Sequence, residues 1–304
     1  MIGTALVDMY TKCAMLSKAQ EVLDELTSRN VICWNALISG YSDQGQCYEA
    51  LKCLEKMESD GVSPDAVTFI CILKACGITG MLDKGKKVHD EIVSRGFLEK
   101  HIILGNALVD MYAKCGSLGK AQQVLEMLPV VDIASWNAVI AGYAQQGLDH
   151  RALDCFERMQ SEGISPDAVT FTSILKLCAR IKAVNKGKQV HKVIASRFML
   201  KKDNVLGNAL VDMYAKCGML IQAQEVLEEI PVRDIVSWCG LLAGYVEQGQ
   251  GQQALACFEK MRSECLSPDP VTYTCILKAC AIVGAIDKGK QIHDEILHVG
   301  FLEK

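Results

Sequence analysis

The chain has 304 residues, of which half are hydrophobic, only 6% are aromatic and six are proline, a composition that favours packed helices over a disordered or β-rich chain. No apolar run approaches the ~18 residues that span a bilayer, so we expect no membrane partner. The formal net charge of −4 argues against a nonspecific, charge-driven nucleic-acid binder, although not against one whose positive charge is confined to a groove.

Fifteen cysteines raise the question of disulfides or metal sites, and their spacing answers it. Nine of them recur at intervals of 102 residues, and no two cysteines lie three positions apart, so there is no CxxC motif. This pattern is typical of small apolar residues at equivalent positions of a repeat, in a reducing compartment. We therefore expect neither a disulfide framework nor a bound metal.

Internal repetition is the dominant feature of the sequence. Trp34, Trp136 and Trp238 are spaced by 102 residues, and the segment GNALVDMYAKCG occurs unchanged at 105–116 and 207–218. The first copy reads GTALVDMYTKCA. The N-terminus resembles the middle of a repeat rather than a signal or transit peptide, so we expect the chain to be part of a longer protein.

Residues 31–65 show the plan of one repeat unit. Trp34, Leu37, Ile38 and Tyr41 follow the i, i+3, i+4, i+7 spacing of an amphipathic helix. Gly45 interrupts that helix, and the apolar residues Ala50, Leu51, Leu54 and Met57 predict a second one. Gly61 is placed to end it, and the turn Ser63-Pro64-Asp65 offers an Asp to cap the following helix.

The next two units, 66–101 and 102–132, repeat this helix–turn–helix pattern at slightly different lengths. A single unit is too small to bury its own apolar face, so neighbouring units must stack. The sequence therefore predicts an all-α fold, a right-handed superhelical α-solenoid of about nine helix-turn-helix repeats. We expect one domain over 1–304, built from three triplets at 1–101, 102–203 and 204–304.

A pentatricopeptide repeat is closely resembled by the 35-residue unit IVSWCGLLAGYVEQGQGQQALACFEKMRSECLSPD. The longer variant of that family is resembled by VTYTCILKACAIVGAIDKGKQIHDEI, and the shorter variant by VLGNALVDMYAKCGMLIQAQEVLEEIPVRD. Their order resembles the PLS subclass known from land-plant organelles. On this resemblance the S-type units are 1–30, 102–132 and 204–234, the P-type units are 31–65, 133–167 and 235–269, and the L-type units are 66–101, 168–203 and 270–304.

The resemblance implies binding of single-stranded RNA, with about one base per unit read by the fifth and last residues. In this chain these residues are Thr4 and Asn30, Asn35 and Asp65, Asn106 and Asp132, Asn137 and Asp167, Thr172 and Asp203, Asn208 and Asp234, and Cys239 and Asp269.

In that family Asn with Asp is associated with uracil, Thr with Asn with adenine, and Thr with Asp with guanine. A thiol at Cys239 is a weak hydrogen-bonding group, and Ile70 offers none, so we expect little discrimination from either unit. With the N-terminus toward the RNA 5′ end, the preferred ligand resembles 5′-A-U-N-U-U-(G)-U-N-N.

Ordinary structural roles compete with these assignments. The Asp residues at unit ends are also good helix caps, whereas Asn just inside a helix has poor helix propensity and suggests another purpose. Aliphatic residues at the second position of a unit either sandwich the base, as in the family, or pack in the core. They are Ile32, Ile103, Ala134, Val205 and Val236.

Lysine recurs at the thirteenth position of the S-type units, as Lys12, Lys114 and Lys216. These side chains either contact RNA phosphates or simply occupy a helix end that favours cations. We favour phosphate contact, because an acidic RNA-binding protein needs local basic sites.

Two motifs suggest enzymes and are better explained as parts of the repeat. The stretches 80–86 and 284–290 approach a phosphate-binding loop but lack its final Ser/Thr, and His89-Asp90-Glu91 matches only half of a deaminase zinc signature. We expect no cofactor and no catalytic residue in this chain. Any deaminase activity would come from another domain or a partner protein.

Two functions remain open. The favoured one is the RNA-targeting module of an editing or processing factor in a mitochondrion or chloroplast, acting with small editing-factor proteins or a deaminase-domain partner. The alternative is a helical scaffold that binds a protein or peptide. The target transcript and the organelle cannot be derived from the sequence.

Overall fold

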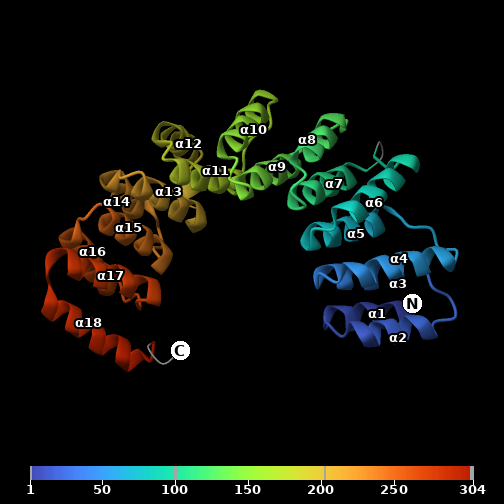
Figure 1. Cartoon of the computed structure of the whole chain (residues 1–304), viewed down its shortest axis with the longest axis horizontal. Helices are drawn as coiled ribbons and strands as arrows, with labels where there is room; N and C mark the ends of the chain where they lie inside the picture. The colour runs from blue at the N-terminus through green and yellow to red at the C-terminus, as the bar shows by residue number, and fades with distance from the viewer. Residues whose placement is uncertain (1, 99–100, 202, 302–304) are drawn as a thin grey trace. The chain divides into compact units, whose positions relative to one another are not determined.

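The computed structural model describes residues 2–98, 101–201 and 203–301, which form α-helices joined by short turns, with no strand in those ranges (Figure 1). The helices of the first triplet are α1 (Ile2–Lys12), α2 (Leu16–Glu25), α3 (Val31–Asp43), α4 (Cys47–Ser59), α5 (Ala66–Thr79) and α6 (Leu82–Ser94). Those of the second are α7 (Ile102–Lys114), α8 (Leu118–Met127), α9 (Ile133–Gln145), α10 (Asp149–Ser161), α11 (Ala168–Ile181) and α12 (Val184–Ser196), followed by the 3-10 turn η1 (Met199–Lys201). The third triplet contains α13 (Asn204–Lys216), α14 (Leu220–Glu229), α15 (Ile235–Glu247), α16 (Gly251–Ser263), α17 (Pro270–Val283) and α18 (Ile286–Val299).

The predicted helix pairs are confirmed. Trp34, Leu37 and Ile38 are fully buried on α3, and Met57 is fully buried on α4, so the apolar spacing identified the buried faces. The turn between α3 and α4 contains Gly45 at φ +67°, a left-handed conformation that costs glycine little because it has no Cβ. The chain is thus an all-α helical-repeat solenoid.

The residues fall into two compact halves, Met1–Ser165 with α1–α10 and Pro166–Lys304 with α11–α18. Within each half, the first helix of a unit packs beside the first helix of the next unit, as α3 does on α5 and α13 on α15. The second helix packs against the first helices of its own unit and of the following one. Each half is therefore two-layered, with the first helices side by side in one layer.

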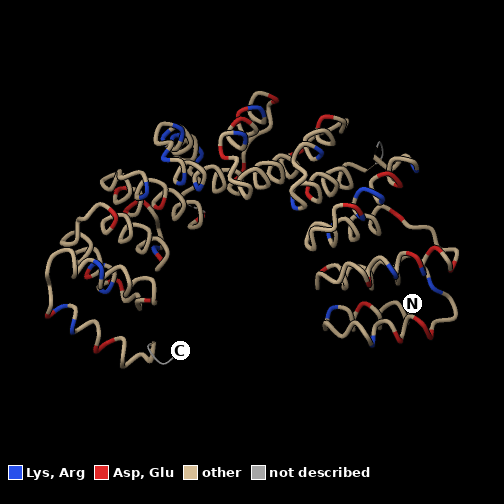
Figure 2. Tube along the Cα trace, in the orientation of Figure 1, with Lys and Arg blue, Asp and Glu red and all other residues tan. Residues whose placement is uncertain are grey.

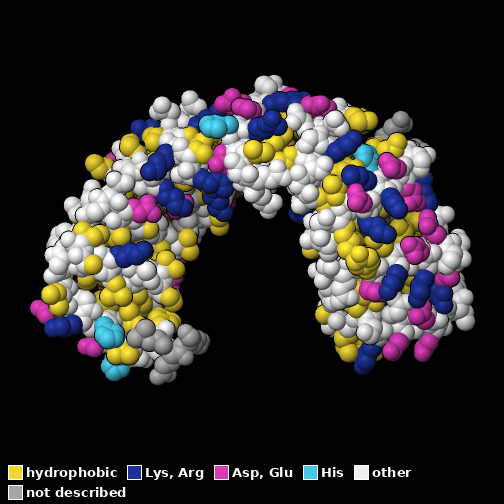
Figure 3. Space-filling model, in the orientation of Figure 1, with side chains coloured by type: hydrophobic (Ala, Val, Ile, Leu, Met, Phe, Trp, Pro, Cys, Tyr) yellow, Lys and Arg dark blue, Asp and Glu magenta, His cyan; other side chains and the backbone are white. Residues whose placement is uncertain are grey.

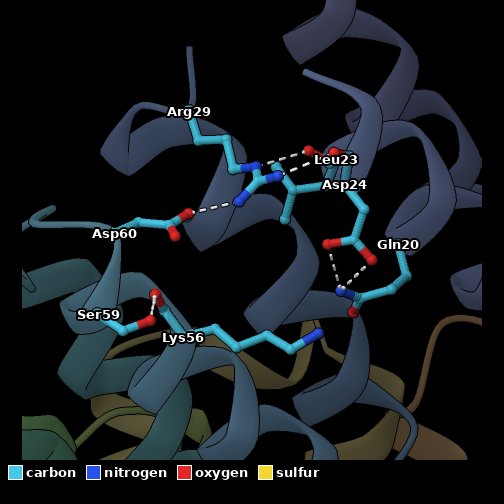
Figure 4. A network of polar contacts seen from close by, with 7 residues as sticks. All are labelled: Gln20, Leu23, Asp24, Arg29, Lys56, Ser59 and Asp60. Carbon is cyan, nitrogen blue, oxygen red and sulfur yellow. Dashed lines mark hydrogen bonds and ion pairs between the residues drawn. The ribbon is translucent and has the colours of Figure 1, made fainter. Parts of the chain in front are cut away.

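An arginine joins the first repeat unit to the second (Figure 4). The Arg29 guanidinium donates to the backbone carbonyls of Leu23 and Asp24, at 2.9 and 2.8 Å, and to the Asp60 carboxylate at 2.7 Å. The carbonyls belong to the last turn of α2, and Asp60 follows α4. One planar cation thus joins two consecutive repeats.

At the junctions from L-type to S-type units, histidine and tyrosine meet across consecutive repeats. His89 Nδ1 lies 2.9 Å from the Tyr112 hydroxyl, and His191 Nδ1 lies 2.9 Å from that of Tyr214. The histidine of the half-matching deaminase motif is therefore a packing residue. Burial lowers the pKa of both imidazoles, which favours their neutral form.

The glycines of the loop-like motifs end helices. Gly80 and Gly284 are the C-terminal caps of α5 and α17, at φ +71° in both cases, and α6 and α18 begin two residues later. These stretches are turns between helices, as expected from the repeat.

All fifteen cysteines are free thiols, and ten of them are buried. Burial raises the pKa of the Cys53 and Cys257 thiols to about 12, so both remain neutral. Across 2–98, 101–201 and 203–301, no group of three His, Cys, Asp or Glu side chains could hold a metal ion. None of the helices in those same ranges is long and apolar enough to cross a membrane.

Candidate nucleic-acid interface

One face of each first helix carries the residues singled out from the sequence. On α7 these are Ile103, Asn106 and Lys114, at positions two, five and thirteen of the unit, and the structure adds Asp110 at position nine. Spacings of three and four residues place them along one line of an α-helix. We call the set of positions two, five, nine and thirteen the open stripe, because its two ends are exposed on α7.

The second-position residues are exposed, so the core-packing alternative is wrong for them. Ile32 is 62% exposed, Ile103 70%, Val205 63% and Val236 60%, and Ala134 is exposed as well. Within each half, these exposed aliphatic side chains stand at the same place on successive first helices, and we call them the aliphatic row. Apolar surfaces of that kind can pack against the faces of bases.

The sequence interpretation missed three members of this aliphatic row. Val67, Val169 and Val271 stand at the second position of the L-type units and are 51%, 61% and 58% exposed. The signal was present, because each lies three residues before a fifth-position residue as in the other units. Every L-type unit therefore presents the same aliphatic platform as the S-type and P-type units.

Asn35 and Asp65 are in direct contact. The Asn35 side-chain amide donates to Asp65 Oδ1 at 3.0 Å, and the Thr68 hydroxyl donates to Asn35 Oδ1 at 2.6 Å. The Asn35 side chain is half-buried on α3, with Ile32 exposed one turn before it. Asn35 thus lies on the open stripe and its amide contacts Asp65 at the edge of that stripe, neither inside the apolar core nor on the second-helix layer.

The units 102–132 and 204–234 repeat this contact. The Asn106 amide donates to Asp132 Oδ2 at 2.7 Å, and the Asn208 amide donates to both carboxylate oxygens of Asp234 at 3.1 Å. Both asparagines are half-buried. Three units in the two halves therefore bring their fifth and last residues together, although these are 26 or 30 positions apart in sequence.

The Asp residues also cap helices, which is the structural role considered from the sequence, and the same carboxylates contact the fifth-position amides. Asp65 accepts from the backbone N–H of Thr68 at 2.9 Å and completes a capping box at the start of α5. Burial by itself raises the pKa of the Asp65 carboxyl, but hydrogen bonds from the Thr68 N–H, the Asn35 amide and the Thr68 hydroxyl outweigh it, and the net pKa is lowered. Asp65 is therefore a fixed anion beside Asn35.

Two units that depart from the Asn–Asp pattern keep part of its geometry. Cys239 Sγ lies 3.8 Å from Asp269 Oδ1 and 3.0 Å from the Thr272 hydroxyl. Burial raises the pKa of the Cys239 thiol to about 11, so a neutral thiol replaces the amide. In the first unit Thr4 Oγ1 lies 3.1 Å from Cys33 Sγ, while the Asn30 side chain caps α3.

The remaining predicted pairs are placed as follows. Thr172 is half-buried on α11, and Asp203 caps α13 by accepting from the backbone N–H groups of Val205 and Leu206. Asn137 is half-buried on α9 of the first half, and Asp167 caps α11 of the second half with a capping box.

The three predicted lysines end the open stripe of the S-type first helices. Each pairs with an Asp one turn earlier on the same stripe, Lys12 with Asp8 at 2.7 Å, Lys114 with Asp110 at 2.6 Å and Lys216 with Asp212 at 3.0 Å. The lysines are exposed and the Asp partners half-buried, and pairs near the surface contribute little stability, so the ammonium groups can exchange partners. Their location agrees with both interpretations, phosphate contact and a favourable helix end.

A second set of lysines was missed. Lys74, Lys176 and Lys278 occupy the ninth position of the L-type first helices and are exposed, with Lys74 bonded to Asp43 of the preceding unit at 2.6 Å. Charge is otherwise interspersed along both halves (Figure 2), and on the face in Figure 3 basic and acidic side chains are intermixed. On the open stripe, lysine therefore recurs at fixed positions, and each thirteenth-position lysine of the S-type units lies beside an Asp of the same stripe.

The family of the chain follows from comparison with known proteins. A model of the PPR repeat family matches residues 29–78, 131–180 and 233–282, and a model of the single PPR repeat matches 4–31, 67–97, 106–130, 208–235 and 271–301. Together they cover most of the sequence. The chain belongs to the pentatricopeptide repeat family.

Relatives with similar sequences are plant proteins. A mitochondrial pentatricopeptide repeat-containing protein of Arabidopsis thaliana is 41% identical over 295 residues, which are 96% of this chain and 46% of the relative. A chloroplastic one from the same plant is 38% identical over 293 residues, 96% of this chain and 54% of the relative. The chain thus spans about half the length of these relatives.

Solved structures show the same fold. The pentatricopeptide repeat protein PPR10 from maize matches with a TM-score of 0.77 at 21% identity, over 97% of this chain and 43% of PPR10. PPR10 in complex with an 18-nt psaJ RNA element matches with a TM-score of 0.71 at 20% identity, over 95% of this chain and 44% of PPR10.

Proposed function

We propose that residues 1–304 form a single array that binds single-stranded RNA sequence-selectively, at about one base per unit. The observation that carries this proposal is the repeated contact between fifth and last residues at the edge of the open stripe. Asn35 with Asp65, Asn106 with Asp132, and Asn208 with Asp234 each offer amide and carboxylate groups beside an exposed aliphatic residue. Short polar groups address base edges, and the aliphatic residues pack on base faces.

The full set of proposed base-reading residues is the one derived from the family resemblance. With it, the preferred RNA is 5′-A-U-N-U-U-(G)-U-N-N. The fifth-position amide alone can both donate to and accept from a pyrimidine edge, which suits uracil. Ile32, Ile103, Ala134, Val205 and Val236 sandwich the bases, joined by Val67, Val169 and Val271. Lys12, Lys114 and Lys216 neutralise phosphates.

The array serves, in this proposal, as the targeting part of an RNA-editing or RNA-processing factor of the PLS subclass in a mitochondrion or chloroplast. Two features support that setting: the S-P-L order of the units, and relatives named as mitochondrial and chloroplastic. RNA chemistry would be supplied by a deaminase-domain partner, with small editing-factor proteins assisting. PPR10 from maize binds an RNA element in its own complex, which supports RNA as the ligand here.

A mobility-shift titration tests the proposal. The purified chain is titrated against 5′-A-U-N-U-U-G-U-N-N, a scrambled RNA of the same composition, and DNA of the same sequence. We expect the first RNA to bind most tightly. Equal binding of all three would overturn the proposal and favour a scaffold for a protein or peptide.

A further inference from the structure

Buried hydroxyl groups recur at one position of the repeat. Among the described residues, buried polar side chains are few, and five of them stand at the third position of a unit: Thr68, Ser135, Thr170, Ser237 and Thr272. Each has 0% exposure. A buried hydroxyl is unfavourable unless it forms hydrogen bonds, so its repetition in the core calls for a partner.

The candidate partners are the capping Asp of the same unit and the fifth residue of the preceding unit. The Thr68 hydroxyl is 2.6 Å from its acceptor Asn35 Oδ1 and 3.0 Å from Asp65 Oδ1, and the Ser135 hydroxyl donates to Asn106 Oδ1. The Thr272 hydroxyl donates to Asp269 Oδ1 at 2.7 Å and lies 3.0 Å from Cys239 Sγ. A third-position residue of one unit therefore reaches back to the side chain that we propose reads a base for the unit before.

The contacts on the two ends of the amide define its orientation. In Asn106 the nitrogen donates to the Asp132 carboxylate and the oxygen accepts from the Ser135 hydroxyl. A flipped amide would place its oxygen against the carboxylate and its nitrogen against a hydroxyl hydrogen. The hydroxyl and the carboxylate thus together determine which amide groups remain to face a nucleotide.

Asn208 provides an internal contrast. Ser237 occupies the same third position, but its hydroxyl donates to the Asp234 backbone carbonyl at 2.7 Å. Asn208 Oδ1 is buried without a hydrogen-bond partner, and the amide nitrogen bonds both Asp234 oxygens. The orientation of Asn208 is therefore held by Asp234 without the hydroxyl.

We propose that a buried third-position hydroxyl that donates to the amide of the preceding unit, as those of Thr68 and Ser135 do, is a positioning residue, which fixes that amide and thereby sets its base preference. This inference rests on the proposed RNA-binding function. At these units, base choice then depends on three residues from two units: the fifth, the last, and the third of the next.

The test compares Ser135→Ala with Ser237→Ala. Both remove a buried hydroxyl three residues after a capping Asp, but only Ser135 contacts the reading amide. Competition binding with RNAs carrying each base at position four, read by Asn106, or at position seven, read by Asn208, gives the preference at each site. Circular dichroism and melting confirm that both variants fold.

We expect Ser135→Ala to lower the preference for U at position four roughly fivefold, the size of one neutral hydrogen bond. Preference at positions two and five stays unchanged. Ser237→Ala should leave the preference for U at position seven unchanged. Ser135→Thr, which keeps the hydroxyl, should retain the wild-type preference for U at position four. Unchanged discrimination at position four in Ser135→Ala, or an equal loss at every position, would overturn the inference. Failure of the RNA-binding proposal itself is recognised separately, because the wild-type chain would then show no base preference anywhere.

Discussion

Asn106 and Asp132 are joined across 2.7 Å, although 26 residues and a whole second helix separate them in sequence. The same Asp carboxylate accepts from the backbone N–H groups of Ala134 and Ser135 and so begins α9. The group that starts one repeat is therefore bonded to the side chain proposed to read a base for the repeat before. Stacking of units and placement of reading groups depend on the same atoms.

Cys239→Asn should create selectivity for U at the eighth nucleotide. Asp269 and Thr272 already surround Cys239 as Asp65 and Thr68 surround Asn35, so the new amide would find both partners in place. One added neutral hydrogen bond is worth about 1 kcal/mol, or roughly fivefold in affinity. The selectivity is measured by fluorescence anisotropy with four RNAs that differ only at position eight. Equal affinity for all four would contradict the assignment.

Exchanging Asn137 for Thr together with Asp167 for Asn should move the preference at the fifth nucleotide from U to A. The new pair matches Thr4 and Asn30 of the first unit. Relative affinities for the four RNAs substituted at position five provide the measurement, and preferences at positions two and four serve as the control. A preference that remains on U would show that these two residues do not read the base.

Replacing Lys114 and Lys216 by Ala should weaken binding of all RNAs alike and reduce its dependence on salt. If both side chains contact phosphates, the slope of log affinity against log salt falls by about 0.7 for each lysine removed. Lys52→Ala is the matched control, because Lys52 is an exposed lysine on a second helix, away from the open stripe. An unchanged slope in the double variant would assign the two lysines to the helix end alone.

Acid should destabilise the fold through His89 and His191. Burial lowers the pKa of both side chains below their ordinary value of 6.5, so the unfolded chain binds more protons than the folded one as the pH falls. The stability contributed by the neutral imidazoles is present above about pH 6.5 and is lost as pH falls through the lowered pKa values.

The melting temperature, measured between pH 7.5 and 5.5, reports this loss of stability. In the His89→Gln/His191→Gln variant the drop in Tm over that interval should be smaller than in the wild type. His150 is exposed on α10, and His150→Gln should leave the drop unchanged. An identical pH response in the double variant and the wild type would contradict the role of these two residues.

Much of the fold could be predicted from the sequence because local rules and the repeat agree. Trp34, Leu37 and Ile38 have helical spacing and are buried, Gly45 adopts the left-handed turn, and Asp65 caps a helix. Each of these depends on residues within a few positions of one another. The 102-residue period then extends the pattern to the rest of the chain.

Contacts between consecutive units could not be predicted in this way. The bond from Thr68 to Asn35 joins residues 33 positions apart, and it depends on how one first helix is placed against the next. Serine stands at the third position in both 133–167 and 235–269, yet only Ser135 contacts the fifth-position amide of the preceding unit. The choice between two acceptors for one hydroxyl depends on its rotamer, which the sequence does not specify.

Whether the residues of the aliphatic row are exposed likewise could not be predicted from the sequence alone. Ile32 and Val236 have the same apolar character as core residues, and only the packing of the first helices leaves them 62% and 60% exposed. Lys74 and its counterparts were missed because they stand at a different position of a different unit type from Lys114. Their alignment appears once the first helices are side by side.

Selection of RNA from a random pool by the purified 304-residue chain tests the central claim most directly. The account predicts enrichment of A at the first position and U at the second, fourth, fifth and seventh, with the third, eighth and ninth positions variable. Enriched sequences without U at the positions assigned to Asn35, Asn106, Asn137 and Asn208, or no enrichment at all, would contradict it.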